Sequence, residues 1–146
     1  MNAVRTIAAC AGMLAILVGG THAVAQDAGG AVTVTTTRLY SATTTASGQP
    51  IALPKGNAEV IVWMYEIPAG AKLAVHKHPS PRYAYVLEGT LRVATADESR
   101  SWEYKAGDFI VEMIDAWHYG MNTGAGPARL LVIDQVEAGQ GNTILR

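Results

Sequence analysis

Residues 70–89 read GAKLAVHKHPSPRYAYVLEG, and this stretch says most about the fold. Two histidines, His76 and His78, are separated here by a single residue. Alternate side chains of a β-strand point to the same face, so a strand would place both imidazoles side by side, about 7 Å apart. Lys77 would then face the opposite way. The pattern therefore predicts a strand that presents two imidazoles on one face.

Short runs of β-branched and aromatic residues recur along the rest of the chain, at intervals of roughly 8–12 residues. Gly and Pro interrupt the chain too often for long helices, and no window between 50 and 146 shows an apolar stripe of helical period. The sequence therefore predicts an all-β sandwich or small barrel. The expected strands are 59–67, 72–78, 82–89, 90–95, 101–105, 109–114, 117–122 and 128–136, with 32–39 as a candidate first strand.

Composition narrows the class of protein. A length of 146 residues favours one domain, and 49% hydrophobic residues are too many for a disordered chain. Eleven Lys and Arg against twelve Asp and Glu give a net charge of −1, which offers no electrostatic footprint for nucleic acid. A single Cys excludes a disulfide framework within one chain and a zinc site made of Cys alone.

The first residues predict export. Arg5 precedes the apolar run 7–18, and Ala23 and Ala25 form the small-residue pattern of a signal-peptidase site. The run is too short for an uncleaved anchor, which needs about twenty apolar residues. We therefore expect a signal peptide at 1–25, a Thr/Ser-rich arm at 26–50 and a barrel at 51–146. The mature protein would be periplasmic or secreted, with no membrane attachment and no Cys.

A third histidine could join the H-x-H pair. After the signal peptide the only histidines are His76, His78 and His118, and His118 falls in a different expected strand. A closed sheet can bring all three together. Three neutral imidazoles would suit a divalent transition metal (Fe, Mn, Ni, Cu or Zn) and leave positions open for water and substrate. The alternatives are a surface or pocket pair without metal and a His118 that only packs and forms hydrogen bonds.

The spacing around the histidines resembles a known family. The first cupin motif is G-x5-H-x-H-x3-E-x6-G, and Gly70, His76, His78 and Gly89 occupy its positions. Arg82 stands where the motif has Glu. Residues 55–136 carry the whole resemblance.

Residues 107–122, GDFIVEMIDAWHYGMN, resemble the second cupin motif, G-x5-P-x-G-x2-H-x3-N. Gly107, His118 and Asn122 match, whereas Met113 stands for Pro and Asp115 for Gly. Two motifs in the right order, with a suitable gap between them, identify the chain as a member of the cupin superfamily.

The resemblance implies a double-stranded β-helix, or jelly-roll barrel, with a metal site in its mouth. It assigns His76, His78 and His118 as metal ligands and Asn122 as a structural residue near the second motif, although a substrate contact also stays open for Asn122. The motif glycines Gly70, Gly89 and Gly107 would be turn residues. The family often forms homodimers through edge strands, so we expect a homodimer in which the segment 32–38 serves as an arm.

Arg82 departs from the family pattern, because a guanidinium cannot bind a cation. It could turn away from a three-His site, hold an anionic ligand, or form a structural ion pair. Glu112 is the candidate to replace the missing carboxylate or to pair with Arg82. Strand alternation leaves its direction open, since it shares a face with Ile110 while Phe109, Val111 and Met113 share the other.

The sequence thus predicts an exported single-domain cupin that binds one divalent transition metal through three His and a small-molecule ligand. The favoured activity is an oxygen-dependent, dioxygenase-like reaction on a small organic acid, with Arg82, Glu112 or Asn122 as neighbouring contacts. A metal-free module that binds a small anion through Arg82, without catalysis, is the alternative. A dimer with an inert pocket is a third hypothesis. The metal and the substrate are not named by the sequence.

Overall fold

The computed structural model describes residues 33–146. The expected signal peptide, 1–25, lies outside the described residues. Residues 36–146 form one compact unit, and residues 33–35 belong to another, in which they are exposed and have no regular secondary structure. Within the described part no helix occurs, so none is present that could cross a membrane.

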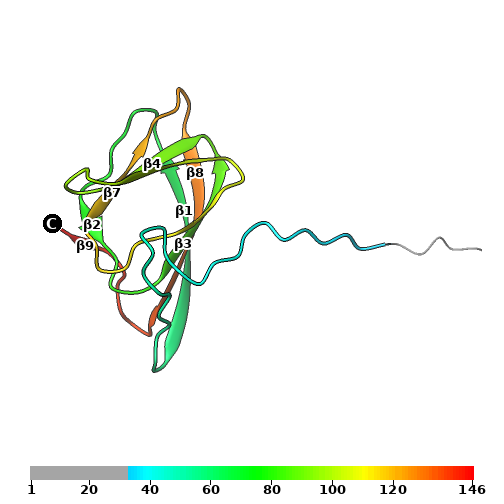
Figure 1. Cartoon of the computed structure of the whole chain (residues 1–146), viewed down its shortest axis with the longest axis vertical. Coiled ribbons are helices and arrows are strands. Elements are labelled where there is room, and N and C mark those ends of the chain that lie inside the picture. Colours follow the sequence, from blue (N-terminus) through cyan, green and yellow to red (C-terminus); the bar gives the residue numbers. More distant parts are fainter. Residues whose placement is uncertain (1–32) are drawn as a thin grey trace, which may run out of the picture. The chain divides into compact units, whose positions relative to one another are not determined.

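The compact unit consists of two antiparallel sheets that face each other (Figure 1). The first contains β1 (Ala58–Ile67), β8 (Ala128–Glu137), β3 (Arg82–Glu88) and β6 (Phe109–Val111), in that order. The second has the order β5 (Ser101–Lys105), β4 (Thr90–Thr95), β7 (His118–Asn122), β2 (His76–Lys77), β9 (Ile144–Leu145). The expected all-β fold is confirmed.

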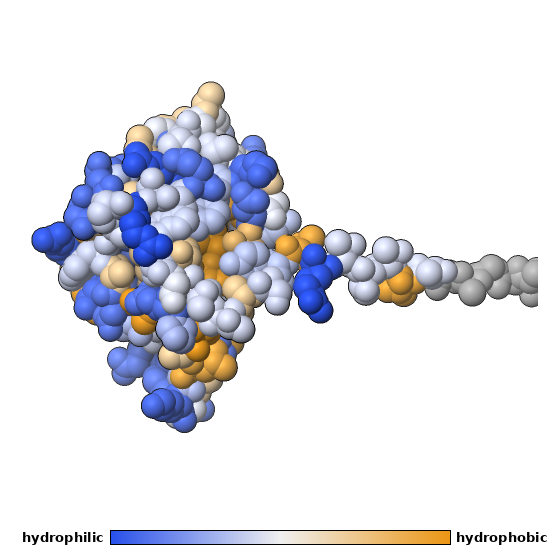
Figure 2. Space-filling view, viewed as in Figure 1, coloured by the Kyte–Doolittle hydropathy of each residue, from blue (hydrophilic) through white to orange (hydrophobic). Residues whose placement is uncertain are grey.

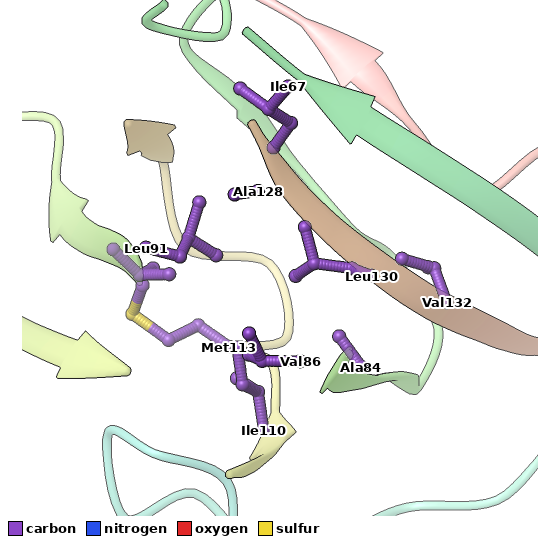
Figure 3. Close-up of a cluster of buried hydrophobic side chains, with 10 residues drawn as sticks. Ile67, Ala84, Val86, Leu91, Ile110, Met113, Ala128, Leu130 and Val132 are labelled. Atoms are coloured by element: carbon purple, nitrogen blue, oxygen red, sulfur yellow. The ribbon is translucent and has the colours of Figure 1, made fainter. Parts of the chain in front are cut away.

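Apolar side chains from both sheets meet between them. On β8, Ala128, Leu130 and Val132 are buried at alternate positions, as a strand with one face in the core requires. Figure 3 shows these side chains directed toward those of the opposite sheet and the connecting segments. The complete cluster comprises Ile67, Ala84, Val86, Leu91, Val93, Ile110, Met113, Ala128, Leu130 and Val132.

The expected strands agree with the structure except at four places. Strand β6 ends at Val111, three residues before the expected end at 114. The candidate strand 32–39 is wrong for its described residues, which pair with no other strand. Strand β2 has two residues instead of the expected seven, because only His76 and Lys77 form regular pairs. Strand β9 was not expected, since two residues that pair only with β2 leave no periodic pattern in the sequence.

The end of the predicted arm is fastened to the barrel. The Gln49 side chain donates from Nε2 to the Ile114 carbonyl at 2.6 Å and accepts from the Ile114 amide at 3.1 Å. The amide of Ala46 donates to the carbonyl of Val111. These contacts hold the segment 46–49 against the end of β6, where Val111 is buried.

The turns follow the glycines picked out by the motifs. Gly70, Gly89 and Gly107 all have positive φ, at 72°, 78° and 93°. Asp115, which stands for the Gly of the second motif, also has a positive φ of 54°. The backbone at that point therefore keeps the left-handed conformation that Gly would adopt at lower cost.

The outer face of the first sheet is apolar. Val60, Val62 and Met64 alternate along β1 and are each more than half exposed. Tyr40, Tyr85 and other side chains continue this face around a shallow cleft of about 570 Å³ (lined by Arg38, Leu39, Tyr40, Tyr85, Phe109, Leu131 and Ile133). Figure 2 shows apolar side chains gathered low on the body, where Figure 1 draws β1. The expected homodimer stays a prediction, and this face is suited to it.

Replacing Gly89 by Ala should destabilise the fold much more than replacing Gly107. Both residues have positive φ, but a Cβ at Gly89 would lie 2.6 Å from the Pro127 carbonyl oxygen, whereas nothing lies within 4 Å of one at Gly107. We expect a loss of about 1 kcal/mol in the free energy of unfolding for Gly107→Ala and at least about 3 kcal/mol for Gly89→Ala. Urea denaturation of both variants measures this, and equal losses would contradict the argument.

Charges on the apolar face should abolish a dimer. We expect the protein lacking residues 1–25 to sediment as a dimer and the double variant Val62→Glu/Met64→Glu as a monomer, because two carboxylates would be buried unpaired in the contact. Analytical ultracentrifugation gives the masses. Lys105→Glu on β5 is the control and should leave the mass unchanged. A monomeric parent protein would refute the dimer.

Candidate metal centre

The three expected ligand histidines lie together. His76 on β2 is directly opposite His118 on β7 in the antiparallel register, and His78 follows β2. The ring centroids are 4.6 Å apart for His76 and His118, and 4.9 Å for each of the other two pairs. All three residues are buried, and one ligand atom from each lies within 4.8 Å of the others. The distant His118 thus joins the H-x-H pair.

Backbone carbonyls hold all three imidazoles in place. Each Nδ1 atom lies within hydrogen-bond distance of a carbonyl oxygen, which can only accept. Each Nδ1 therefore carries a proton, and in the neutral ring Nε2 is left with a free lone pair. The pairs are His76 with Ala74 (2.7 Å), His78 with Asn142 (2.6 Å) and His118 with Ala116 (2.8 Å).

The Nε2 atoms of His78 and His118 are buried and have no hydrogen-bond partner. Buried polar atoms without partners are rare, because each one loses its hydration without replacement. A metal ion bound by the lone pairs would compensate for that loss. The residues therefore fit a transition metal, with His76, His78 and His118 as the nitrogen donors.

Burial also favours the neutral rings that bind metal. It lowers the pKa of His78 to about 4 and lowers the pKa of His76 as well, since a charged imidazolium is poorly solvated inside the barrel. Both rings are therefore neutral at neutral pH and need not lose a proton to bind a cation.

Glu112 faces the site, which settles the question that alternation left open. Its side chain is 12% exposed, and its Oε2 lies 3.3 Å from Nε2 of His118. Ile110 and Glu112 share the inward face as alternation requires, and the Glu112 amide still donates to the Arg82 carbonyl. Met113 is buried in the core as well, so alternation fails only after Glu112, where the pairing with β3 ends.

The pKa values of Glu112 and His118 shift in opposite directions. Burial acts against the charge on both groups, but their proximity outweighs it. The pKa of Glu112 is lowered by His118, with smaller effects from His78 and Arg82. The pKa of His118 is raised by the Glu112 carboxylate. Negative charge on Glu112 thus favours a cation at this place.

Arg82 forms a buried ion pair with Asp134. Nε and Nη2 of Arg82 donate to the two carboxylate oxygens of Asp134, each at 2.7 Å. Of the roles considered for Arg82, the structural ion pair is therefore present, and its partner is Asp134 instead of Glu112. Although burial opposes the charge, the pKa of Asp134 is lowered, chiefly by the hydrogen bond from Arg82.

Two further side chains complete the surroundings of Asp134. Trp63 donates from Nε1 at 2.8 Å, and Asn142 donates from Nδ2 at 2.6 Å. Asn142 also holds His78 through its carbonyl, so it links the ion pair to the imidazole cluster. Sequence analysis missed both Asp134 and Asn142, although a single Asp inside the apolar run 128–136 was a usable signal for a buried, paired carboxylate.

Asn122 has the structural role that the motif implies. It is fully buried, and its amide donates to the carbonyls of Ile67 and Gly126, both at 2.8 Å. Its Oδ1 accepts from the amide of Gly124. It therefore shapes the turn after β7, and it does not line the cavity beside the histidines.

Two connected spaces adjoin the imidazoles. The inner cavity, of about 30 Å³, is lined by His76, His118, Glu112 and Arg82 together with core side chains. An outer cleft of about 170 Å³ shares its lining residues Tyr65, Leu73, His76 and Arg82, and the β9 side chain of Leu145 completes it. Such volumes admit only a small molecule.

Comparisons with known proteins agree with this architecture. A family model described as "Cupin domain" matches residues 63–134. An oxalate decarboxylase from Lactobacillus farciminis, solved as a formate complex, is 27% identical with a TM-score of 0.51. The match covers 59% of this chain but only 26% of the decarboxylase, so the chain corresponds to about a quarter of that protein's length.

Two other solved structures share the fold at lower identity. BH2720 from Bacillus halodurans is 22% identical, with 59% and 69% of the two chains covered and a TM-score of 0.50. The polyketide cyclase RemF from Streptomyces resistomycificus is also 22% identical, with 66% and 68% covered and a TM-score of 0.50. No curated protein matches the sequence.

Replacing Asp134 by Ala should strongly lower the free energy of unfolding. Asp134→Ala leaves the Arg82 guanidinium buried without its partner, and we expect a loss of about 3 to 5 kcal/mol in the free energy of unfolding. Glu103→Ala is the matched control, because Glu103 pairs with Arg92 at the surface at 3.7 Å. There we expect less than about 1 kcal/mol. Chemical denaturation measures both, and similar losses would show that the buried pair contributes no special stability.

Proposed function

The chain belongs to the cupin superfamily, and from that premise we propose that it binds one divalent transition-metal ion through His76, His78 and His118 and acts on a small organic acid. The observation that carries the proposal is the convergence of three buried imidazoles whose Nδ1 atoms are all bound to carbonyls. Each ring therefore offers Nε2 as its ligand atom, and one ligand atom of each ring lies within 4.8 Å of the others. A structural packing role would not require three rings of one tautomer.

The donor set leaves the ion with unfilled positions. Three protein nitrogens occupy half of an octahedral shell, so water, substrate or dioxygen has room to bind. When bound, the metal would supply Lewis-acid and oxygen chemistry, which favours a dioxygenase-like reaction. The residues of the chain would position the substrate beside it.

Arg82 is the residue we assign to substrate orientation. It lines both the inner cavity and the outer cleft. Its pair with Asp134 uses Nε and Nη2, which leaves Nη1 to donate to a substrate carboxylate. The small cleft supports a substrate of few atoms, in keeping with the formate complex of the similar decarboxylase. The N-terminal pattern supports a periplasmic or secreted location.

A metal-free module that binds an anion is the competing function. The buried Nε2 atoms of His78 and His118 argue against it, because a site without metal would leave both atoms without a partner. The two functions differ in one observable. If formate raised the melting temperature of metal-free protein as much as that of metal-loaded protein, the binding module would be favoured; we expect a shift only with metal present.

Protein recovered from its exported compartment should contain about one equivalent of a transition metal by elemental analysis. His78→Ala should lose most of it, because the variant removes one of three nitrogen donors. Lys77→Ala is the control, since Lys77 lies between two of the histidines in sequence but extends outward to Asp115 at 2.8 Å. Metal-free parent protein that also fails to bind added Mn²⁺, Fe²⁺, Co²⁺ or Zn²⁺ would contradict the proposal.

A further inference from the structure

We propose that Glu112 is a fourth protein ligand of the same metal, which it binds through Oε2; this inference rests on the proposed function. The resulting donor set is three imidazole nitrogens and one carboxylate oxygen. The carboxylate comes from the segment that follows β6, on the sheet opposite the one that carries His76 and His118.

The strand register directs Glu112 toward the ion. The amide of Glu112 donates to the carbonyl of Arg82 at 2.9 Å, which extends the β3–β6 pairing by one position beyond Tyr83 and Val111. Residues directly opposite in an antiparallel pair point to the same face. Arg82 and Glu112 accordingly both line the inner cavity, in which His118 also lies.

The contact between Glu112 and His118 requires a positive charge between the two atoms. Oε2 of Glu112 and Nε2 of His118 are 3.3 Å apart, both are buried, and neither has a hydrogen bond. Nδ1 of His118 holds its proton on the Ala116 carbonyl, so in the neutral ring a nitrogen lone pair faces a carboxylate lone pair. Two such lone pairs repel unless a positive charge, either a proton on Nε2 or a metal ion, lies between them.

The distance fits a shared metal. With bonds of about 2.1 Å, two neighbouring ligand atoms of one ion lie about 3.0 to 3.4 Å apart. The observed 3.3 Å falls in that range.

Two cationic side chains of this region are engaged elsewhere. Arg82 is paired with Asp134, and Lys77 is paired with Asp115. Among residues 33–146, His118 is the one basic group within 4.0 Å of the Glu112 carboxylate. A bound metal would satisfy Glu112, His118 and His78 together, whereas a proton on His118 would leave the buried Nε2 of His78 without a partner.

A carboxylate ligand also narrows the choice of metal. An anionic oxygen favours harder ions such as Mn²⁺ and Fe²⁺ more than a set of imidazoles alone does. Four protein donors would leave two positions of an octahedral shell for substrate or another small molecule.

The test compares the parent protein with Glu112→Gln, Glu112→Asp and the surface control Glu103→Gln. Mn²⁺ affinity is measured by calorimetry, and the ligand set is followed by the visible absorption of bound Co²⁺. We expect Glu112→Gln to weaken Mn²⁺ binding by more than about 100-fold and to change the Co²⁺ spectrum. Glu112→Asp keeps the charge and should recover part of the affinity. Glu103→Gln should match the parent protein in both measurements.

The outcomes separate the two proposals. An unchanged Co²⁺ spectrum in Glu112→Gln, with or without a modest loss of affinity, would overturn the fourth-ligand assignment and leave the three-His site in place. Parent protein that binds neither ion would overturn both proposals. Near-ultraviolet circular dichroism of the metal-free variants checks that each retains the folded barrel.

Discussion

The hydrogen bond from each Nδ1 atom to a main-chain carbonyl is the constraint on which the candidate metal centre depends. It fixes the tautomer and the ring plane together, so the position of Nε2 becomes a property of the backbone. Two of the three carbonyls, those of Ala74 and Ala116, lie two residues before the histidine that they hold. The third belongs to Asn142, far along the chain. Folding of the barrel and alignment of the lone pairs are therefore one event.

Asn142 joins the site to the rest of the sheet. Its carbonyl holds His78, its amide donates to Asp134, and Asp134 in turn is held by Arg82. The Arg that replaces a carboxylate in the first motif is thus part of the support around the imidazoles. A buried pair of this kind is costly to desolvate, and its value lies in the orientation that its hydrogen bonds impose.

The sequence was sufficient for the parts of the site that obey local rules. The H-x-H spacing predicted two imidazoles on one face, and the second motif added His118, because strand periodicity and turn glycines are local properties. The direction of Glu112 was not predictable, since Ile110 and Val111 lie on opposite faces of β6 and both are buried. The Arg82–Asp134 pair joins β3 to β8, and only the sheet order brings these strands together. Strand β9 was missed because two residues are too few to show the alternation of buried and exposed side chains that marks a strand.

The short strand β9 has a consequence for any change made close to Arg146. Ile144 and Leu145 pair with Lys77 and His76, and the amide of Arg146 donates to the carbonyl of Val75. Leu145 and Thr143 also border the outer cleft. A purification handle or fusion partner joined directly after Arg146 would pull on the same ladder that positions an imidazole. Such a fusion therefore needs a flexible linker that leaves the pairing between β9 and β2 unstrained.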